Sequence, residues 1–191
     1  MFDEFDNWKE SLGYDHVLYL MMAEHEVLLE LLDNLEDVNS NIQKFVSYDE
    51  AKKDIEALSN IINIIISAEA HHQREEKVLF PELIKRGVVG PTKVMTWEHH
   101  ELREYKHELK TLAVKINAEN FINVKKEINF IIQQFIPELR EHILKENNVL
   151  YPISLDFIQD NEVWKQIKEK CDQIGYCPFT PVSLVNSNLS E

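Results

Sequence analysis

Apolar residues recur at intervals of three and four along most of the chain, which is the spacing that places them on one face of an α-helix. Few residues interrupt this pattern, since the 191 residues include only four Gly and six Pro. Short connections make successive helices antiparallel neighbours. The pattern therefore predicts an all-α protein, an up-and-down antiparallel four-helix bundle with short extra helical segments at the termini. The four long helices are expected at about residues 15–37, 48–80, 92–117 and 121–150.

The two ends of the chain do not continue this pattern. We expect an N-terminal extension over residues 1–14, the bundle over 15–153, and a C-terminal helix and tail over 154–191. The stretch EVWKQIKEKCDQIG predicts a short helix that ends at Gly175, because glycine readily adopts the left-handed backbone that closes a helix. The final residues, SLVNSNLSE, are expected to form a loose tail.

One sequence pattern occurs twice, at the ends of the second and fourth predicted helices. HHQREEKVLFPEL begins at His71, and HILKENNVLYPIS begins at His142. Each copy has a histidine, three further residues and a glutamate, followed by an apolar residue, an aromatic residue and a proline at the same offset. The two helices are expected to end at these prolines, Pro81 and Pro152, because proline disrupts a helix interior. The same pattern on two alternate helices predicts a site with approximate twofold symmetry.

Each copy places a histidine and a glutamate four residues apart, so that both side chains can reach one metal site. In the fourth helix the apolar stripe includes His142, Glu146 and Val149, so these side chains are expected to point inward. In the second helix the stripe includes Glu75 and passes close to both His71 and His72. Periodicity therefore does not choose between these two histidines, whereas the matching offset of the repeat favours His71.

The other two long helices each carry one histidine on the apolar stripe, His25 in the first and His99 in the third. The pattern places no Lys or Arg on the inward faces. A buried carboxylate costs several kcal/mol unless it is paired or bound to metal, so the inward His and Glu predict a dinuclear metal site. The candidate ligands are His25, His71, Glu75, His99, His142 and Glu146. The remaining histidines, His16, His72, His100 and His107, are expected at the surface.

Imidazole and carboxylate ligands without thiolate suit iron, with manganese or zinc as alternatives. If both glutamates bridge, each metal ion receives two histidines and two carboxylate oxygens. A bridging oxygen makes five ligands and leaves one position open for a small ligand. The two cysteines, Cys171 and Cys177, have no His or Cys beside them, so neither a second metal site nor a disulfide framework is expected.

The chain has 34 acidic and 20 basic residues, a formal net charge of −14. This balance argues against nucleic acid or an anionic membrane as a partner, because phosphate binding needs clustered Lys and Arg. We expect neither a signal peptide nor a membrane span, because the acidic N-terminal residues lack an apolar run and no apolar run elsewhere is long enough. Two cysteines are typical of a reducing compartment, so we expect a cytoplasmic protein. A protein partner remains open, and the sequence does not indicate the oligomeric state.

These motifs resemble the hemerythrin-like (HHE cation-binding) family over roughly residues 16–152. The spacings are similar to those of bacterial di-iron proteins for the repair of iron centres. The stretches RGVVGPTKVM and DQIGYC are similar to hemerythrin-like domains that precede sensory domains. The resemblance implies two non-haem Fe ions, oxo- or hydroxo-bridged, with four terminal histidines and two bridging glutamates. The motifs that carry it are the inward His25, His71-x-x-x-Glu75 running into LFP, Met95-x-x-Glu98-His99, and His142-x-x-x-Glu146-N-N-V-L-Y-P.

Two features of this chain depart from the patterns of the proteins that it resembles. Oxygen-carrying hemerythrins have a further histidine four residues after the third-helix ligand, where this chain has Arg103. The repair proteins carry an N-terminal cysteine-bearing domain, whereas this chain has no cysteine before Cys171. We therefore expect a site that binds or reacts with O2, NO or peroxide, in sensing or in the oxidative and nitrosative stress response. The alternatives are an iron donor for the repair of damaged iron–sulfur centres, and an iron-storage or structural bundle. The sequence leaves open whether the site is catalytic.

Overall fold

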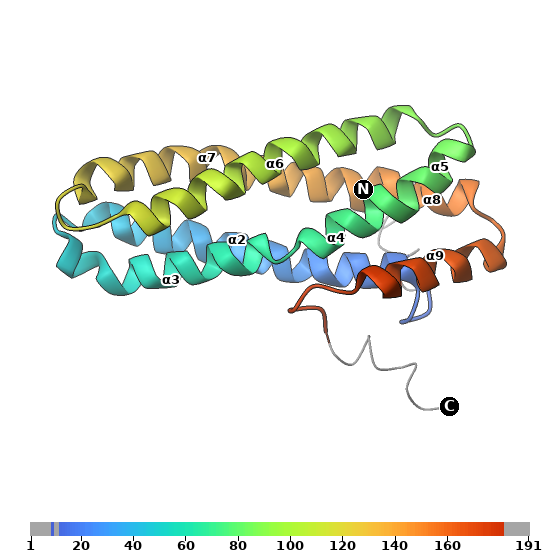
Figure 1. Cartoon of the computed structure of the whole chain (residues 1–191), viewed down its shortest axis with the longest axis horizontal. Helices are drawn as coiled ribbons and strands as arrows, with labels where there is room; N and C mark the ends of the chain where they lie inside the picture. Colours follow the sequence, from blue (N-terminus) through green and yellow to red (C-terminus); the bar gives the residue numbers. More distant parts are fainter. Residues whose placement is uncertain (1–8, 10–11, 182–191) are drawn as a thin grey trace, which may run out of the picture. The chain divides into compact units, whose positions relative to one another are not determined.

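The computed structural model describes residue 9 and residues 12–181, and every regular element in this part of the chain is helical (Figure 1). The prediction of an all-α protein is therefore confirmed for the described residues. None of the helices in these residues is long and apolar enough to cross a membrane. The elements are α2 (Val17–Lys44), α3 (Tyr48–Ile66), α4 (Glu69–Arg74), the π-helical turn η1 (Glu75–Leu79), α5 (Phe80–Lys85), α6 (Gly90–Lys115), α7 (Phe121–Lys145), the π-helical turn η2 (Glu146–Leu150), α8 (Tyr151–Phe157) and α9 (Asn161–Ile174).

The chain forms two compact units. The first unit takes residues up to Val27, Ala68–Trp97 and the chain from His142 onward, and the second takes Leu28–Ser67 and Glu98–Glu141. Part of the second unit's core comes from α3, which begins with a capping box. The Ser47 side chain accepts the backbone N–H of Glu50, and the Glu50 carboxylate accepts that of Ser47. The buried residues of α3 recur every three or four positions, at Ala51, Ile55, Leu58, Ile62 and Ile65.

The core of the first unit combines the beginning of α2 with residues from the C-terminal part of the chain. Leu18 and Met21 of α2 belong to the same buried cluster as Ile167 and Cys171 of α9. The predicted C-terminal helix is present and ends at Gly175, whose φ of +90° lies in the region that favours glycine. The predicted loose tail lies in residues 182–191, outside the described part of the chain. Since α9 contacts both α4 and η1, it lies beside the segment that carries His71.

The prediction that the helices end at the two prolines is wrong, because the backbone stays helical past both of them. Pro81 lies in the first turn of α5 and Pro152 in the first turn of α8. In each case a π-helical turn precedes the proline, and the N–H of the aromatic residue donates to the carbonyl of the glutamate five residues earlier. The wider π turn displaces the carbonyl that a proline ring would otherwise strike in an α-helix.

The π turns and one further break alter the helix phase that simple periodicity predicts. Val149, placed inward by the pattern, is 48% exposed, while Leu150 is buried. A π turn inserts an extra residue, so side chains beyond Glu146 rotate relative to a continuous α-helix. The predicted single helix over residues 48–80 is also interrupted after α3, where the Ser67 hydroxyl donates to the carbonyl of Ile64 at 2.6 Å.

Candidate metal centre

The six side chains predicted as metal ligands are all buried, each with at most 2% of its surface exposed. Five of them belong to the first unit, and they come from three separate stretches of the chain. These five are His25 on α2, His71 on α4, Glu75 at the start of η1, His142 near the end of α7, and Glu146 at the start of η2. His99 lies on α6 in the second unit, and its role as a ligand stays a prediction.

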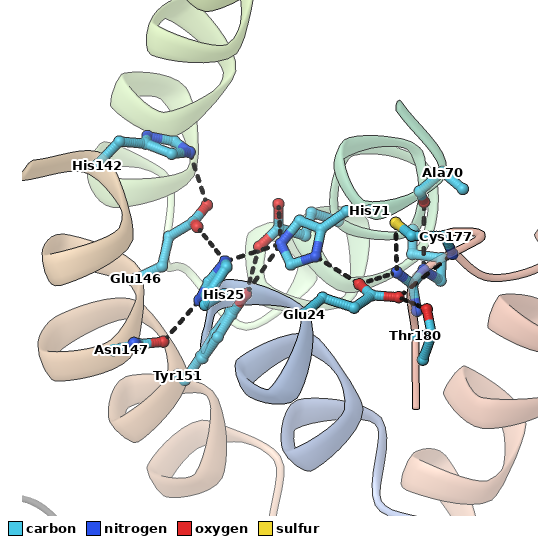
Figure 2. Close-up of polar contacts among 12 residues, drawn as sticks. Glu24, His25, Ala70, His71, His142, Glu146, Asn147, Tyr151, Cys177 and Thr180 are labelled. Atoms are coloured by element: carbon cyan, nitrogen blue, oxygen red, sulfur yellow. Dashed lines mark hydrogen bonds and ion pairs between the residues drawn. The ribbon is translucent and has the colours of Figure 1, made fainter. Parts of the chain in front are cut away.

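Within the first unit, the ring nitrogens of two histidines meet a carboxylate (Figure 2). His25 Nε2 lies 3.0 Å from His71 Nε2 and 3.2 Å from Glu146 Oε2. The potential ligand atoms of these three residues all lie within 4.8 Å of one another. The remaining two carboxylate–histidine distances are 3.6 Å from His71 Nε2 to Glu75 Oε2 and 3.1 Å from His142 Nε2 to Glu146 Oε1. The repeat thus brings together His–Glu pairs from both of its copies.

The hydrogen bonds of the His25 and His71 rings indicate whether this arrangement fits a metal ion. His25 Nδ1 lies 2.8 Å from Asn147 Oδ1, and His71 Nδ1 lies 2.7 Å from Glu24 Oε2. Both oxygens accept hydrogen bonds, so each Nδ1 carries a proton, and Nε2 is the ring nitrogen that remains to hold a metal ion or to share a proton. Two such nitrogens 3.0 Å apart beside a carboxylate repel each other unless a proton or a metal ion lies between them. The donor set and its orienting partners therefore fit a metal ion such as iron.

A fully buried tyrosine contacts this cluster. The Tyr151 hydroxyl donates to Glu75 Oε1 at 2.9 Å and lies 3.5 Å from His71 Nε2, and its ring stacks on that of His25. Burial, followed by the charges of Glu75 and Glu146, raises the pKa of Tyr151 well above its ordinary value. The hydroxyl therefore remains a hydrogen-bond donor at neutral pH. Sequence reasoning did not assign it a role, although Tyr151 occupies the aromatic position of the second repeat, where the first has Phe80.

A buried ion pair lies beside His71, and it corrects the prediction that no Lys or Arg points inward. Arg74 is fully buried and donates to Glu24 Oε2, the carboxylate oxygen that also accepts from His71. Burial alone would raise the pKa of Glu24, but the hydrogen bond and charge of His71 and the charge of Arg74 hold it well below its usual range. Glu24 is therefore ionised. The one sequence signal for Arg74 is its position three residues after His71, on the same helix face.

Two histidines predicted at the surface are not solvated as expected. His72 is buried, and its ring lies edge-on to the rings of His71 and His142, with 6.1 Å between the ring centroids in each pair. More of the α4 surface is therefore buried than a single apolar stripe predicts. His16 is half-buried against the ring of Trp164, and burial lowers its pKa to about 4 although Asp15 opposes this. The other two, His100 and His107, are exposed as predicted.

Comparison with known proteins agrees with a helical, metal-binding class. The family model described as the hemerythrin HHE cation binding domain matches residues 16–154. The chain therefore belongs to the hemerythrin HHE cation-binding family, which confirms the resemblance found in the sequence.

Several curated relatives bear the name Iron-sulfur cluster repair protein YtfE. The one from Musicola paradisiaca (strain Ech703) is 27% identical over 153 residues, which are 78% of this chain and 68% of the relative. The one from Pectobacterium carotovorum subsp. carotovorum (strain PC1) is 27% identical over 154 residues, or 78% and 69% of the two chains. A third, from Yersinia pseudotuberculosis serotype IB (strain PB1/+), is 36% identical over 90 residues, or 44% and 40%.

Proposed function

We propose that this protein holds a non-haem di-iron centre and acts in the repair of iron–sulfur clusters damaged by oxidants or nitric oxide. The ligand set that we propose is the one expected from the sequence: His25, His71, Glu75, His99, His142 and Glu146. The up-and-down four-helix arrangement over residues 15–153 and the cytoplasmic setting belong to the same proposal. The convergence of His25 Nε2, His71 Nε2 and Glu146 Oε2 carries it, because these three buried groups together form a donor set that suits a metal ion. The names of the curated relatives support the assignment to repair.

Bound iron would supply Lewis-acid and one-electron chemistry, together with an ion that can be passed to a damaged cluster. The chain supplies the surroundings. Glu75 and Glu146 bring negative charge to a buried place, where it offsets the charge of the metal ions. Asn147 and Glu24 hold the two imidazole rings by their Nδ1–H groups, which fixes the direction of Nε2. Buried side chains around these groups keep bulk water away from them.

One observation favours a second candidate function, the binding of or reaction with O2, NO or peroxide. Tyr151 keeps a proton-bearing hydroxyl 3.5 Å from His71 Nε2, inside a fully buried region. By turning from Glu75, to which it donates here, this hydroxyl can form a hydrogen bond with a small ligand that carries oxygen or nitrogen. Under this second function the ligand would bind reversibly, and the iron would stay with the protein.

Iron content tests the ligand assignment first. We expect nearly two irons per chain in anaerobically purified wild-type protein, and one or none in Glu75→Ala and Glu146→Ala. Glu76→Ala serves as the matched control, because Glu76 directly follows Glu75 but is only half-buried. Circular dichroism should show that all variants remain helical. Two irons per chain in both Glu75→Ala and Glu146→Ala would contradict the bridging assignment.

Iron transfer then separates the two functions. Iron-loaded protein is mixed with a purified iron–sulfur protein whose cluster has been damaged by nitric oxide, in the presence of sulfide and thiol. Repair predicts that the cluster absorbance returns while the iron content of this protein falls. Small-ligand binding predicts no transfer, but a spectral change on exposure to NO or O2 that reverses when the gas is removed. The second result would contradict repair.

A further inference from the structure

The chain after α9 returns to the metal centre and covers one of its buried carboxylates. We call residues Tyr176–Pro181 the C-terminal strap; they lie outside the 16–154 range that the family model matches. Thr180 Oγ1 donates to Glu24 Oε1 at 2.5 Å, and the backbone N–H of Cys177 donates to the same oxygen at 3.4 Å (Figure 2). Both strap residues are buried. The strap therefore supplies two hydrogen-bond donors to one oxygen of Glu24. The strap residues and Glu24 all belong to the first unit.

The other oxygen of the same carboxylate belongs to the metal centre. Glu24 Oε2 accepts from His71 Nδ1 at 2.7 Å and from Arg74 Nη2. A carboxylate is planar and rigid, so hydrogen bonds that hold Oε1 also set the direction in which Oε2 meets the imidazole. His71 in turn directs Nε2 toward His25. Thr180, Glu24 and His71 thus form one continuous line of hydrogen bonds from the strap to the candidate ligand atoms.

A second contact ties the strap to Arg74. The Arg74 guanidinium lies over the ring of Tyr176, 4.8 Å from its centroid, and Arg74 Nη2 lies 4.0 Å from Cys177 Sγ. Burial raises the pKa of Cys177 to about 12, with Glu24 adding to this and Arg74 opposing it. The thiol therefore stays protonated at neutral pH and is a poor nucleophile or metal ligand. The strap contributes an aromatic cover and hydrogen-bond donors rather than a thiolate.

We propose that the C-terminal strap controls the release of iron by positioning His71 through Glu24. With the strap in place, Glu24 is anchored and His71 keeps the orientation and basicity that hold a metal ion. When the strap detaches, Glu24 loses two of its donors, and the ion bound through His71 leaves faster. Thr180 is then a positioning residue that acts through Glu24. This inference rests on the proposed function, since it requires that the centre holds iron.

Removing one hydroxyl group tests the proposal while the side chain keeps its shape. The experiment measures how fast iron-loaded full-length protein loses ferrous iron to the chelator ferrozine. Loss of such an outer hydrogen bond typically lowers metal affinity 10- to 100-fold. We expect Thr180→Val to release iron about tenfold faster than wild type, at the lower end of that range because Thr180 acts through Glu24. Thr180→Ser, which keeps the hydroxyl, should release iron at nearly the wild-type rate.

The matched control is Thr111→Val, in which an exposed threonine loses a hydroxyl that donates to the carbonyl of His107. It should leave the release rate unchanged. The faster release in Thr180→Val should also be biphasic, because only the ion bound through His71 is loosened. General destabilisation of the fold would instead accelerate the loss of both ions together.

Hydrogen exchange gives a readout that does not depend on measuring iron release. Coupling between two sites is reciprocal, so if the strap helps to hold iron, bound iron must help to hold the strap by the same factor. The Cys177 amide donates to Glu24 and reports directly on strap detachment. We expect iron loading to slow its exchange about tenfold in wild type and in Thr180→Ser, and to slow it much less in Thr180→Val.

The outcomes separate the strap from the proposed function. If wild-type protein binds iron but Thr180→Val releases it at the rate of Thr111→Val, and iron loading does not slow exchange in the strap, the strap proposal is overturned and the iron site stands. If wild-type protein binds no iron after anaerobic reconstitution, the proposed function and the strap proposal both fall. Fast, biphasic release in Thr180→Val that is restored in Thr180→Ser supports the strap.

Discussion

The two copies of the His-x-x-x-Glu repeat have the same backbone but different polar neighbours. In both, the glutamate begins a π-helical turn and a proline follows in the next helical turn. The copies differ at their aromatic position, where Tyr151 of the second copy donates to Glu75 of the first. Phe80, at the same position in the first copy, has no hydroxyl with which to return this contact to Glu146. One of the two candidate bridging carboxylates is therefore hydrogen-bonded by an aromatic residue of the opposite copy.

The copies also differ at the position three residues after the histidine. Arg74 of the first copy is fully buried and paired with Glu24, whereas Lys145 of the second copy is half-buried. Glu24 in turn holds His71 and meets the C-terminal strap. The repeated sequence thus gives two similar sets of candidate ligands, while unlike buried partners make the two sets inequivalent. If two metal ions bind as proposed, we infer from this difference that they are held unequally.

The largest expected effect comes from breaking the buried ion pair of the first copy. Arg74→Met should lower the free energy of unfolding of the metal-free protein by about 3–5 kcal/mol, because it leaves Glu24 charged and buried without its guanidinium partner. The equivalent change in the second copy, Lys145→Met, should cost less than about 1 kcal/mol, since a half-exposed cation is largely screened by water. Urea unfolding followed by circular dichroism measures both, and equal losses would contradict the difference between the copies.

A smaller effect is expected when the tyrosine hydroxyl is removed, which makes the aromatic positions of the two copies alike. Tyr151→Phe should lower the free energy of unfolding by about 1.5–3 kcal/mol, the usual range for a hydrogen bond to a charged group. Tyr105→Phe is the matched control, because the Tyr105 hydroxyl donates to an exposed carboxylate, that of Glu138, at 3.1 Å. The control should change stability by less than about 0.5 kcal/mol. A loss in Tyr151→Phe no larger than in the control would show that the hydroxyl adds nothing to the cluster.

The smallest expected effect concerns the two adjacent histidines of the first copy, and it tests which of them is the metal ligand. The second copy has Ile143, a buried apolar residue, at the position equivalent to His72. His72→Leu should therefore leave the iron content of the purified protein near that of wild type. His71→Leu should lower it, since His71 Nε2 faces His25 Nε2 at 3.0 Å. Iron retained in His71→Leu but lost in His72→Leu would reverse the assignment.

Much of the helical framework and the candidate site could be predicted because both depend on local periodicity. Residues three and four apart share a helix face, so the apolar stripe predicted that His25 and His142 are buried. The repeat offset favoured His71 over His72, and this choice stays a prediction, because both histidines are buried. The stripe was less reliable beyond Glu146, because a π turn changes the number of residues per turn. Simple periodicity therefore misplaced Val149.

By itself, the sequence determined the helical class, the repeated His–Glu pairs and the family, all of which are patterns within single helices. Only the tertiary structure decided the environment of those pairs. Glu24 and Thr180 are 156 residues apart in the sequence, and Arg74 and Cys177 are 103 apart. No helical period relates positions so distant, so the burial of Arg74 and the anchoring of Glu24 follow only once α9 has packed beside α4. A charged residue becomes a buried partner when the fold supplies the opposite charge, and that pairing depends on contacts in space.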